Sequence, residues 1–297
     1  MILFAVVHLP KGGPADIYAA DPSASPAAIA RMKELWGLDR PLHVQYGRWL
    51  SRVVQGDWGR SFVERRPARD VIMDRLGNTL RLTGAALLVG LVLGVSLGIV
   101  AGVSRNPLVR NVARLVAVIG MSVPTFWSGA LVLLVFSSYL RWIPSGGVAT
   151  IGAPPSLVDT LWHLAAPALV LGSVYVAQWT RYVQAGLDAV RDEDFVRTAR
   201  SKGLSPLRAM LRHGLVNVLL PLVTVLGLEV PRLISGAMVT EVVFTWPGIG
   251  RLLHGSLMTR DYPVVMGILV VAALAVILAN LITDMLYAVL DPRVRYG

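Results

Sequence analysis

Long apolar runs separated by polar connections form the main pattern along this chain. A helix that crosses a bilayer needs about 20 apolar residues, and five stretches reach that length. They are Leu82–Val103, Leu115–Leu140, Thr160–Thr180, Gly214–Thr240 and Tyr262–Thr283. Only the fourth run contains charged residues, Glu229 and Arg232. The pattern therefore predicts an all-α fold, a polytopic transmembrane helix bundle with five full spans.

The N-terminal stretch Met1–Leu9 is apolar but too short to be a sixth span. At about 1.5 Å per residue it cannot cross a hydrocarbon core of about 30 Å. It also lacks the basic start and small-residue cleavage site of a signal peptide. We interpret it as part of an incomplete first helix, and we expect the functional polypeptide to begin upstream of Met1.

A more polar segment follows before the first full span. Within it, Val44, Trp49 and Val53 recur near helical spacing among charged residues, which predicts short amphipathic helices at the membrane surface. We therefore divide the chain in two. Residues 1–76 form a partial first span plus an external amphipathic segment, and residues 77–297 form a transmembrane domain with a cytoplasmic loop at 186–214.

Composition and charge agree with a membrane protein. Hydrophobic residues make up 55% of the chain and charged residues 15%, whereas soluble domains average about 25% charged. The net charge is +10, but the basic residues gather between the apolar runs, as the positive-inside rule expects. This places Arg105, Arg197–Arg212 and the C-terminus in the cytoplasm. Membrane lipid, not nucleic acid, is the expected partner.

A glycine strip runs through the first full span. Gly90, Gly94, Gly98 and Gly102 recur every fourth residue, a spacing that lets another helix approach closely. The strip contains the pattern G-x-S-x-G, but a nucleophile elbow requires a strand–turn–helix context. The chain also has no Gly-Lys dipeptide for a phosphate loop and no H-E-x-x-H. We therefore expect no enzyme activity, no metal site and no ATP hydrolysis by this chain.

Two features mark candidate positions along a translocation path. Pro124, beside Ser122, and also Pro167 and Pro221 fall inside predicted spans; such prolines either shape the bundle or line a path that opens and closes. Glu229 and Arg232 are three residues apart and share a helix face. They either neutralise each other or form a polar lining of the path.

The densest run of charge lies between the third and fourth spans. Asp194 begins a short segment with acidic residues at its start and Arg200 and Lys202 at its end, which suits a helix dipole. Gly203 is a natural residue after a helix C-terminus, and Ser205-Pro206 restarts a helix as N-cap and N1. This capping predicts a short cytoplasmic helix that docks onto a partner; the alternative is a solvated basic loop.

The same stretch, "DFVRTARSKGLSPLRAMLRHGLVNVLLP", resembles the cytoplasmic EAA loop of ABC-importer permeases. The match narrows to the first (B-type) subunit of the dipeptide/oligopeptide/nickel group through "SVPTFWSG", "TEVVFTWPGIGRLL", "RDYPVV" and "DPRVRYG". The chain departs from the general pattern because Arg197 and Thr198 stand where the loop usually begins Glu-Ala. Glu229 and Arg232 also replace residues that are usually uncharged.

The resemblance implies a type I ABC importer permease in a bacterial or archaeal inner membrane. Its partners would be a second, homologous permease in a heterodimer, two cytoplasmic ATPases that bind ATP and Mg, and an external substrate-binding protein. By position, the loop at 192–206 would couple to the ATPase through Phe195, Arg197, Thr198, Ala199, Arg200, Lys202, Gly203 and Leu204. The solute would be a peptide or similar small molecule. An ion-coupled secondary transporter is the alternative, but midplane charges and inverted repeats are not evident.

Overall fold

The computed structural model describes residues 39–219 and 237–290, with residues 4, 5, 7, 25–27, 30, 31 and 34, and it describes no side chains at 286–290. The described part is helical and contains no strand beyond a single bridge between Arg60 and Pro67. The all-α prediction is confirmed. The chain divides into two compact units, Met1–Gly77 with Gly248–Ala273 and Asn78–Pro247 with Leu274–Gly297.

The first unit combines the N-terminal segment with a later stretch of the chain. It contains α4 (Leu42–Val54), the start of α5 (Ala68–Val89), α13 (Ile249–Met258) and the start of α14 (Tyr262–Leu290). Its core consists of five buried side chains, namely Ala68, Ile72, Ile249, Val264 and Ile268. Helix α4 occupies the stretch for which the apolar spacing predicts an amphipathic helix.

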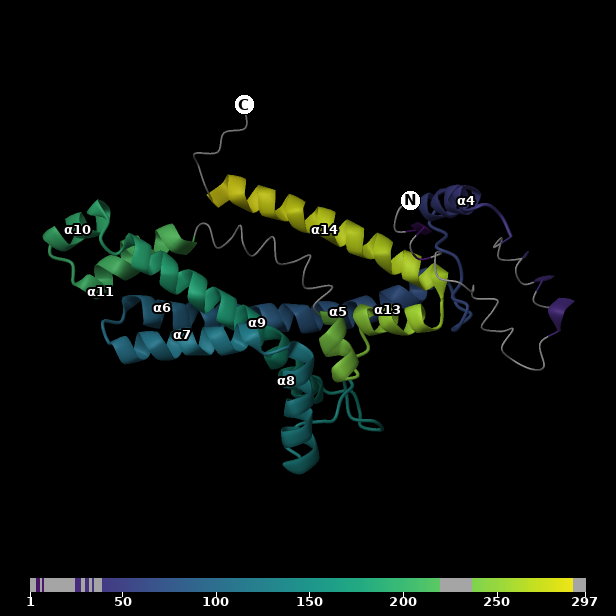
Figure 1. Ribbon diagram of the computed structural model, residues 1–297, viewed down its shortest axis with the longest axis horizontal. Coiled ribbons are helices and arrows are strands. Elements are labelled where there is room, and N and C mark those ends of the chain that lie inside the picture. Colours follow the sequence, from purple (N-terminus) through teal and green to yellow (C-terminus); the bar gives the residue numbers. More distant parts are fainter. Residues whose placement is uncertain are drawn as a thin grey trace. The chain divides into compact units, whose positions relative to one another are not determined.

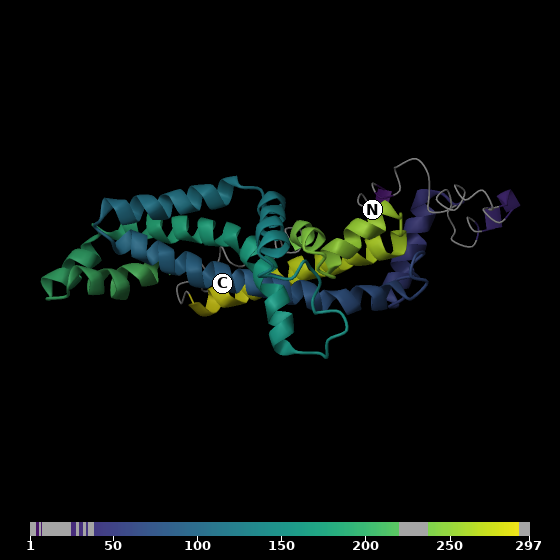
Figure 2. The ribbon, with the colours of Figure 1, turned by 90° about the horizontal axis from the view of Figure 1, so that it is seen from below.

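The second unit is built around one long helix, α9 (Leu157–Val190). Helix α5 continues through a π-helical turn, Gly90–Gly94, into α6 (Val95–Val103), and α7 (Pro107–Ser122) follows. Both α6 and α7 lie along α9 (Figures 1 and 2). Beyond α9 come α10 (Asp194–Ser201), α11 (Pro206–Ala209) and a π-helical turn, Met210–Gly214.

Within the described residues, three helices are long and apolar enough to cross a membrane: Ala68–Val103, Leu157–Val190 and Tyr262–Met285. They contain the first, third and fifth predicted spans, and each extends beyond the uncharged run that identified it. A fourth crossing is possible if a bent helix pair counts as one span. The fourth predicted span, Gly214–Thr240, lies largely outside the described residues, as do most of Met1–Leu9 and the tail after Leu290.

The predicted span Leu115–Leu140 is sharply bent at its proline. Helix α7 ends at Ser122, and α8 (Thr125–Val132) continues through the π-helical stretch Leu133–Tyr139 at an angle of 99° to it. The cause is Pro124, which has no N–H to donate and forces the preceding residue out of the helical region. Val123 is accordingly extended, with ψ 122°. Pro167, by contrast, is accommodated inside the continuous helix α9, and Pro221 lies outside the described residues.

Candidate functional site

The charged loop after α9 folds as its capping pattern predicts. Helix α10 ends at Ser201, and the chain turns at Gly203, whose φ is +89°. The turn is closed by hydrogen bonds from the Gly203 N–H to the Arg200 carbonyl at 3.0 Å and from the Leu204 N–H to the Ala199 carbonyl at 3.3 Å. The Ser205 hydroxyl then accepts from the Arg208 N–H at 3.4 Å and caps α11. The segment is therefore two helices joined by a defined turn, in the place where the sequence allowed a solvated basic loop as the alternative.

The two faces of α10 differ in kind. Val196 and Ala199 are buried in the core of the second unit, and Leu204 packs against the same core. The outward residues are Phe195, Arg197, Thr198, Arg200, Lys202 and Gly203. Phe195 stands at the rim with 40% of its surface exposed. The outward surface thus offers one aromatic ring surrounded by three cationic side chains.

Ala199, one of the residues expected at the coupling surface, is buried and does not lie on the outward surface with Phe195. The two residues are one turn apart, but Ala199 also lies one turn from Val196, and Val196 is almost fully buried. The apolar face formed by Val196 and Ala199 turns inward, because burying two apolar side chains is favourable and, apart from Phe195, the rest of the helix is polar. Ala199 therefore holds α10 in place and is not available to a partner.

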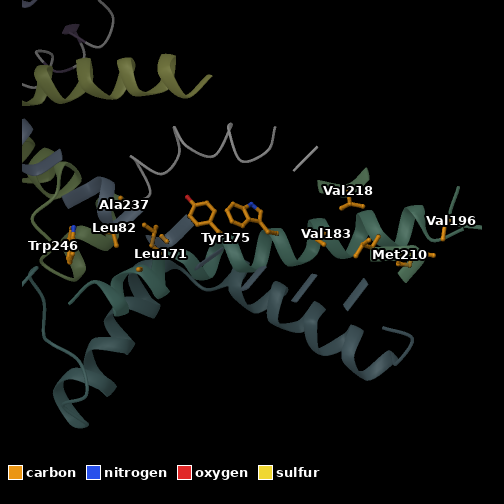
Figure 3. Close-up of a cluster of buried hydrophobic side chains, with 14 of the residues drawn as sticks. Leu82, Leu171, Tyr175, Val183, Val196, Met210, Val218, Ala237 and Trp246 are labelled. Atoms are coloured by element: carbon orange, nitrogen blue, oxygen red, sulfur yellow. The ribbon is translucent and has the colours of Figure 1, made fainter. Parts of the chain in front are cut away.

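The core under α10 is continuous with the core of the spans. Val196 and Met210 belong to the same cluster of buried side chains as Val183, Tyr175 and Leu171 of α9 (Figure 3). Packed interiors are stiff, so this shared core connects α10 mechanically to α9.

The glycine strip faces α9. A Cβ added at Gly90 would lie 2.5 Å from the Tyr175 Cβ, and one at Gly98 would lie 2.7 Å from the Val183 Cβ. The corresponding distances are 3.0 Å from Gly94 to the Val176 carbonyl oxygen and 2.7 Å from Gly102 to the Leu187 Cδ1. Real Cβ atoms essentially never approach to under 3.0 Å, so the contact between the helices requires Gly90, Gly98 and Gly102. A side chain at Gly94 would need its neighbours to shift by a few tenths of an ångström.

Two of the four candidates for a translocation path lie within the described structure. Ser122 and Pro124 are exposed at the break between α7 and α8. Glu229 and Arg232 lie outside the described residues. Among the described residues, no group of three His, Asp or Glu side chains is arranged to hold a metal ion.

The sequence interpretation overlooked a buried acid in the second unit. Glu241 is completely buried in the second unit, and its Oε1 accepts a hydrogen bond from the Thr79 hydroxyl of α5 at 2.6 Å. Nearby, the Trp246 indole N–H donates to the Asn78 carbonyl at 2.9 Å, and the Asn78 amide donates to the Pro247 carbonyl at 3.0 Å. A carboxylate at the end of a long apolar run, as in "TEVVFTWPGIG", is the signal that could have found it.

Comparison with protein families gives a match over residues 94–296. The matching family model is described as the binding-protein-dependent transport system inner membrane component. The matched region includes the glycines from Gly94 onward, the bend at Pro124 and the whole of the α10 loop.

Individual relatives match over nearly the whole chain. The oligopeptide transport system permease protein AppB of Bacillus subtilis is 38% identical over 297 residues, which is 100% of this chain and 94% of AppB. The glutathione transport system permease protein GsiC of Salmonella paratyphi A is 40% identical over 296 residues, 100% of this chain and 93% of GsiC. The two relatives are named for different solutes.

Proposed function

Because this chain belongs to the family of binding-protein-dependent transport system inner membrane components, we propose that α10 is the coupling helix through which an ATPase drives it. The family consists of multi-pass membrane permeases of ABC import systems, not of enzymes, and a separate subunit hydrolyses ATP. An ion-coupled secondary transporter is not favoured.

The observation that supports this assignment is the two-faced structure of α10. Val196 and Ala199 fix the helix to the core of the spans, while Phe195, Arg197 and Lys202 point outward. An exposed aromatic ring among cations suits insertion into an apolar cleft with an acidic rim. The ATPase is the expected partner, because an ABC import system has to convert ATP binding into motion of its permease.

The assembly and the solute form the second part of the proposal. We propose a heterodimer with a second permease, each subunit forming half of the translocation path, with an external binding protein delivering the solute. The basic residues of the connections support a cytoplasmic α10 and a cytoplasmic C-terminus. The relatives' names support a peptide or peptide-like solute such as glutathione. Ser122, Pro124, Glu229 and Arg232 remain our candidates for the path.

Replacement of one exposed side chain tests the coupling assignment. Phe195→Ala removes the ring without touching the buried face, and losing an interface anchor costs about 2 kcal/mol, or about 30-fold in affinity. We expect less ATPase to co-purify with the permease and slower uptake. Leu108→Ala is the matched control, since Leu108 is an apolar residue of α7 with 69% of its surface exposed. Equal ATPase recovery with both variants would refute the assignment.

A further inference from the structure

Asp188 lies in the last turn of α9 and holds two arginines. Its Oδ2 accepts a hydrogen bond from Nη2 of Arg110, on α7, at 2.7 Å. Its Oδ1 accepts from Nη2 of Arg191, the residue directly after α9, at 3.2 Å. One carboxylate therefore joins α7 to the point at which the chain leaves α9 for α10.

Arg191 extends the connection to α6. Its guanidinium also donates to the backbone carbonyl of Gly102, in the last turn of α6. The last four carbonyls of a helix have no partner within the helix, and a cation at this end is favoured by the helix dipole. Leu187, the neighbour of Asp188, packs on the same glycine, with its Cδ1 2.7 Å from where a Cβ of Gly102 would stand.

The position of this cluster in the chain is what gives it significance. Arg191 precedes the start of α10 at Asp194 by only three residues. Asp188, Arg110 and Arg191 are each about 70% buried as side chains, so their geometry is better defined than that of a fully exposed ion pair. Ion pairs at a protein surface add little to stability. We therefore attribute the cluster to its position, where it connects the ends of three helices.

We propose that Asp188 is a positioning residue for energy coupling, which ties the ends of α6 and α7 to the chain entering α10. This inference rests on the proposed docking of the ATPase at α10. When α10 is displaced, the cluster makes α6 and α7 move with α9. Without it, the residues between α9 and α10 can bend and absorb the displacement, so that ATP is hydrolysed with less solute moved.

The test uses the complete complex, with both permeases, the ATPases and the binding protein, in proteoliposomes. Trialanine and glutathione serve as solutes, and uptake per ATP hydrolysed is measured for Asp188→Asn, Asp188→Glu and Asp284→Asn. Asp284 is an exposed carboxylate of α14 and provides the matched charge change. We expect about a fivefold fall in uptake per ATP for Asp188→Asn, partial recovery for Asp188→Glu and the wild-type ratio for Asp284→Asn.

A second readout needs no solute. This chain has no cysteine, so cysteines introduced at the exposed positions Leu108 and Asp192 are its only spin-labelling sites, and the complex is assembled with cysteine-free partner subunits. The separation of the two labels should stay constant on ATP binding in the otherwise wild-type complex and change in Asp188→Asn. Should Asp188→Asn fail to assemble, Arg110→Gln removes only the α7 side of the cluster and is measured instead.

The outcomes separate this inference from the function on which it rests. If Phe195→Ala leaves ATPase recovery unchanged, the docking assignment fails. If Phe195→Ala weakens recovery while Asp188→Asn keeps both the uptake ratio and a constant label distance, only the role of Asp188 is overturned. Failure of both Asp188→Asn and Arg110→Gln to assemble would make the cluster a folding element and would also overturn its coupling role.

Discussion

The hydroxyl of Thr180 donates a hydrogen bond to the backbone carbonyl of Gly94 at 3.2 Å, and the contact is buried between α9 and the end of the π-helical turn before α6. The absence of a side chain at Gly94 favours this close approach, because Val176 and Trp179 lie about 3 Å from where a Cβ of Gly94 would stand. At this point of the helix interface, Gly94 and Thr180 are both closely packed and hydrogen-bonded to each other.

Replacing Thr180 with valine keeps the shape of the side chain and removes the donor. Interhelical hydrogen bonds in membrane proteins contribute about 0.6 kcal/mol on average, so Thr180→Val should lower the free energy of unfolding by about that amount. Thermal denaturation of the detergent-purified protein measures the change. Thr180→Ser keeps the hydroxyl and serves as the control, so equal melting temperatures for the two variants would mean that the bond does not stabilise the interface.

A methyl group in the glycine strip should be costlier. In Gly98→Ala the new Cβ would lie 2.7 Å from the Val183 Cβ and 2.9 Å from the Thr180 carbonyl oxygen. Overpacking of this kind costs about 1–3 kcal/mol. Gly84→Ala on α5 is the control, because no atom lies within 4 Å of its added Cβ, and alanine is about 1 kcal/mol better than glycine inside a helix. We expect a lower melting temperature for the first variant and no loss for the second.

These glycines also show how far the sequence leads. Their four-residue spacing predicts a tightly packed face without naming the partner helix, because the spacing describes only one side of the contact. The uncharged runs locate the long helices but not their ends. Helix α5 contains Asp70 and Arg81 before its uncharged part begins, because a helix can continue through polar residues as long as its backbone hydrogen bonds continue. The charged residues therefore limit the apolar run but do not mark the end of the helix.

Other features depend on contacts between residues distant in the chain. Pro124 and Pro167 look alike in the sequence, yet one separates two helices and the other lies inside α9. Ala199 could not be assigned to the inner face of α10 without knowing that Val196 meets the core. Asp188 reads as an ordinary charge near a helix end, and its role emerges only when Arg110 and the end of α6 are brought beside it.

The buried acid Glu241 allows a matched pair of threonine substitutions on α5. Thr79→Val removes the hydroxyl that donates to Glu241 at 2.6 Å, and leaving a buried acceptor short of a partner costs about 1–3 kcal/mol. Thr83→Val is the control, because the Thr83 hydroxyl is also buried but donates to the Thr79 carbonyl of its own helix at 2.8 Å. We expect lower membrane abundance and melting temperature for Thr79→Val than for Thr83→Val. The reverse order would show that Glu241 does not depend on Thr79.

In the first unit, Asp261 fixes the segment that precedes α5. It is buried just before α14, where its Oδ2 accepts from the Ser61 hydroxyl at 2.5 Å and its Oδ1 from the Phe62 N–H at 3.1 Å. The Val63 N–H donates to Oδ2 at 3.4 Å. Both oxygens of the carboxylate accept hydrogen bonds from these donors. Asparagine would place an NH2 group in one of the two oxygen positions, and that group cannot accept a hydrogen bond from the donor that faces it.

Asp261→Asn should therefore release this segment. Hydrogen bonds to a charged group contribute about 1.5–3 kcal/mol each, so losing even one should exceed the effect of breaking an exposed bond. Limited trypsin digestion after the exposed residue Arg65 should be several times faster than in the wild type. Asp57→Asn is the control, because Asp57 accepts only one exposed hydrogen bond, from the Gly59 N–H at 2.9 Å, among those described for it. If both variants are cut at the wild-type rate, contacts such as those of Ile72 with the core hold the segment without help from Asp261.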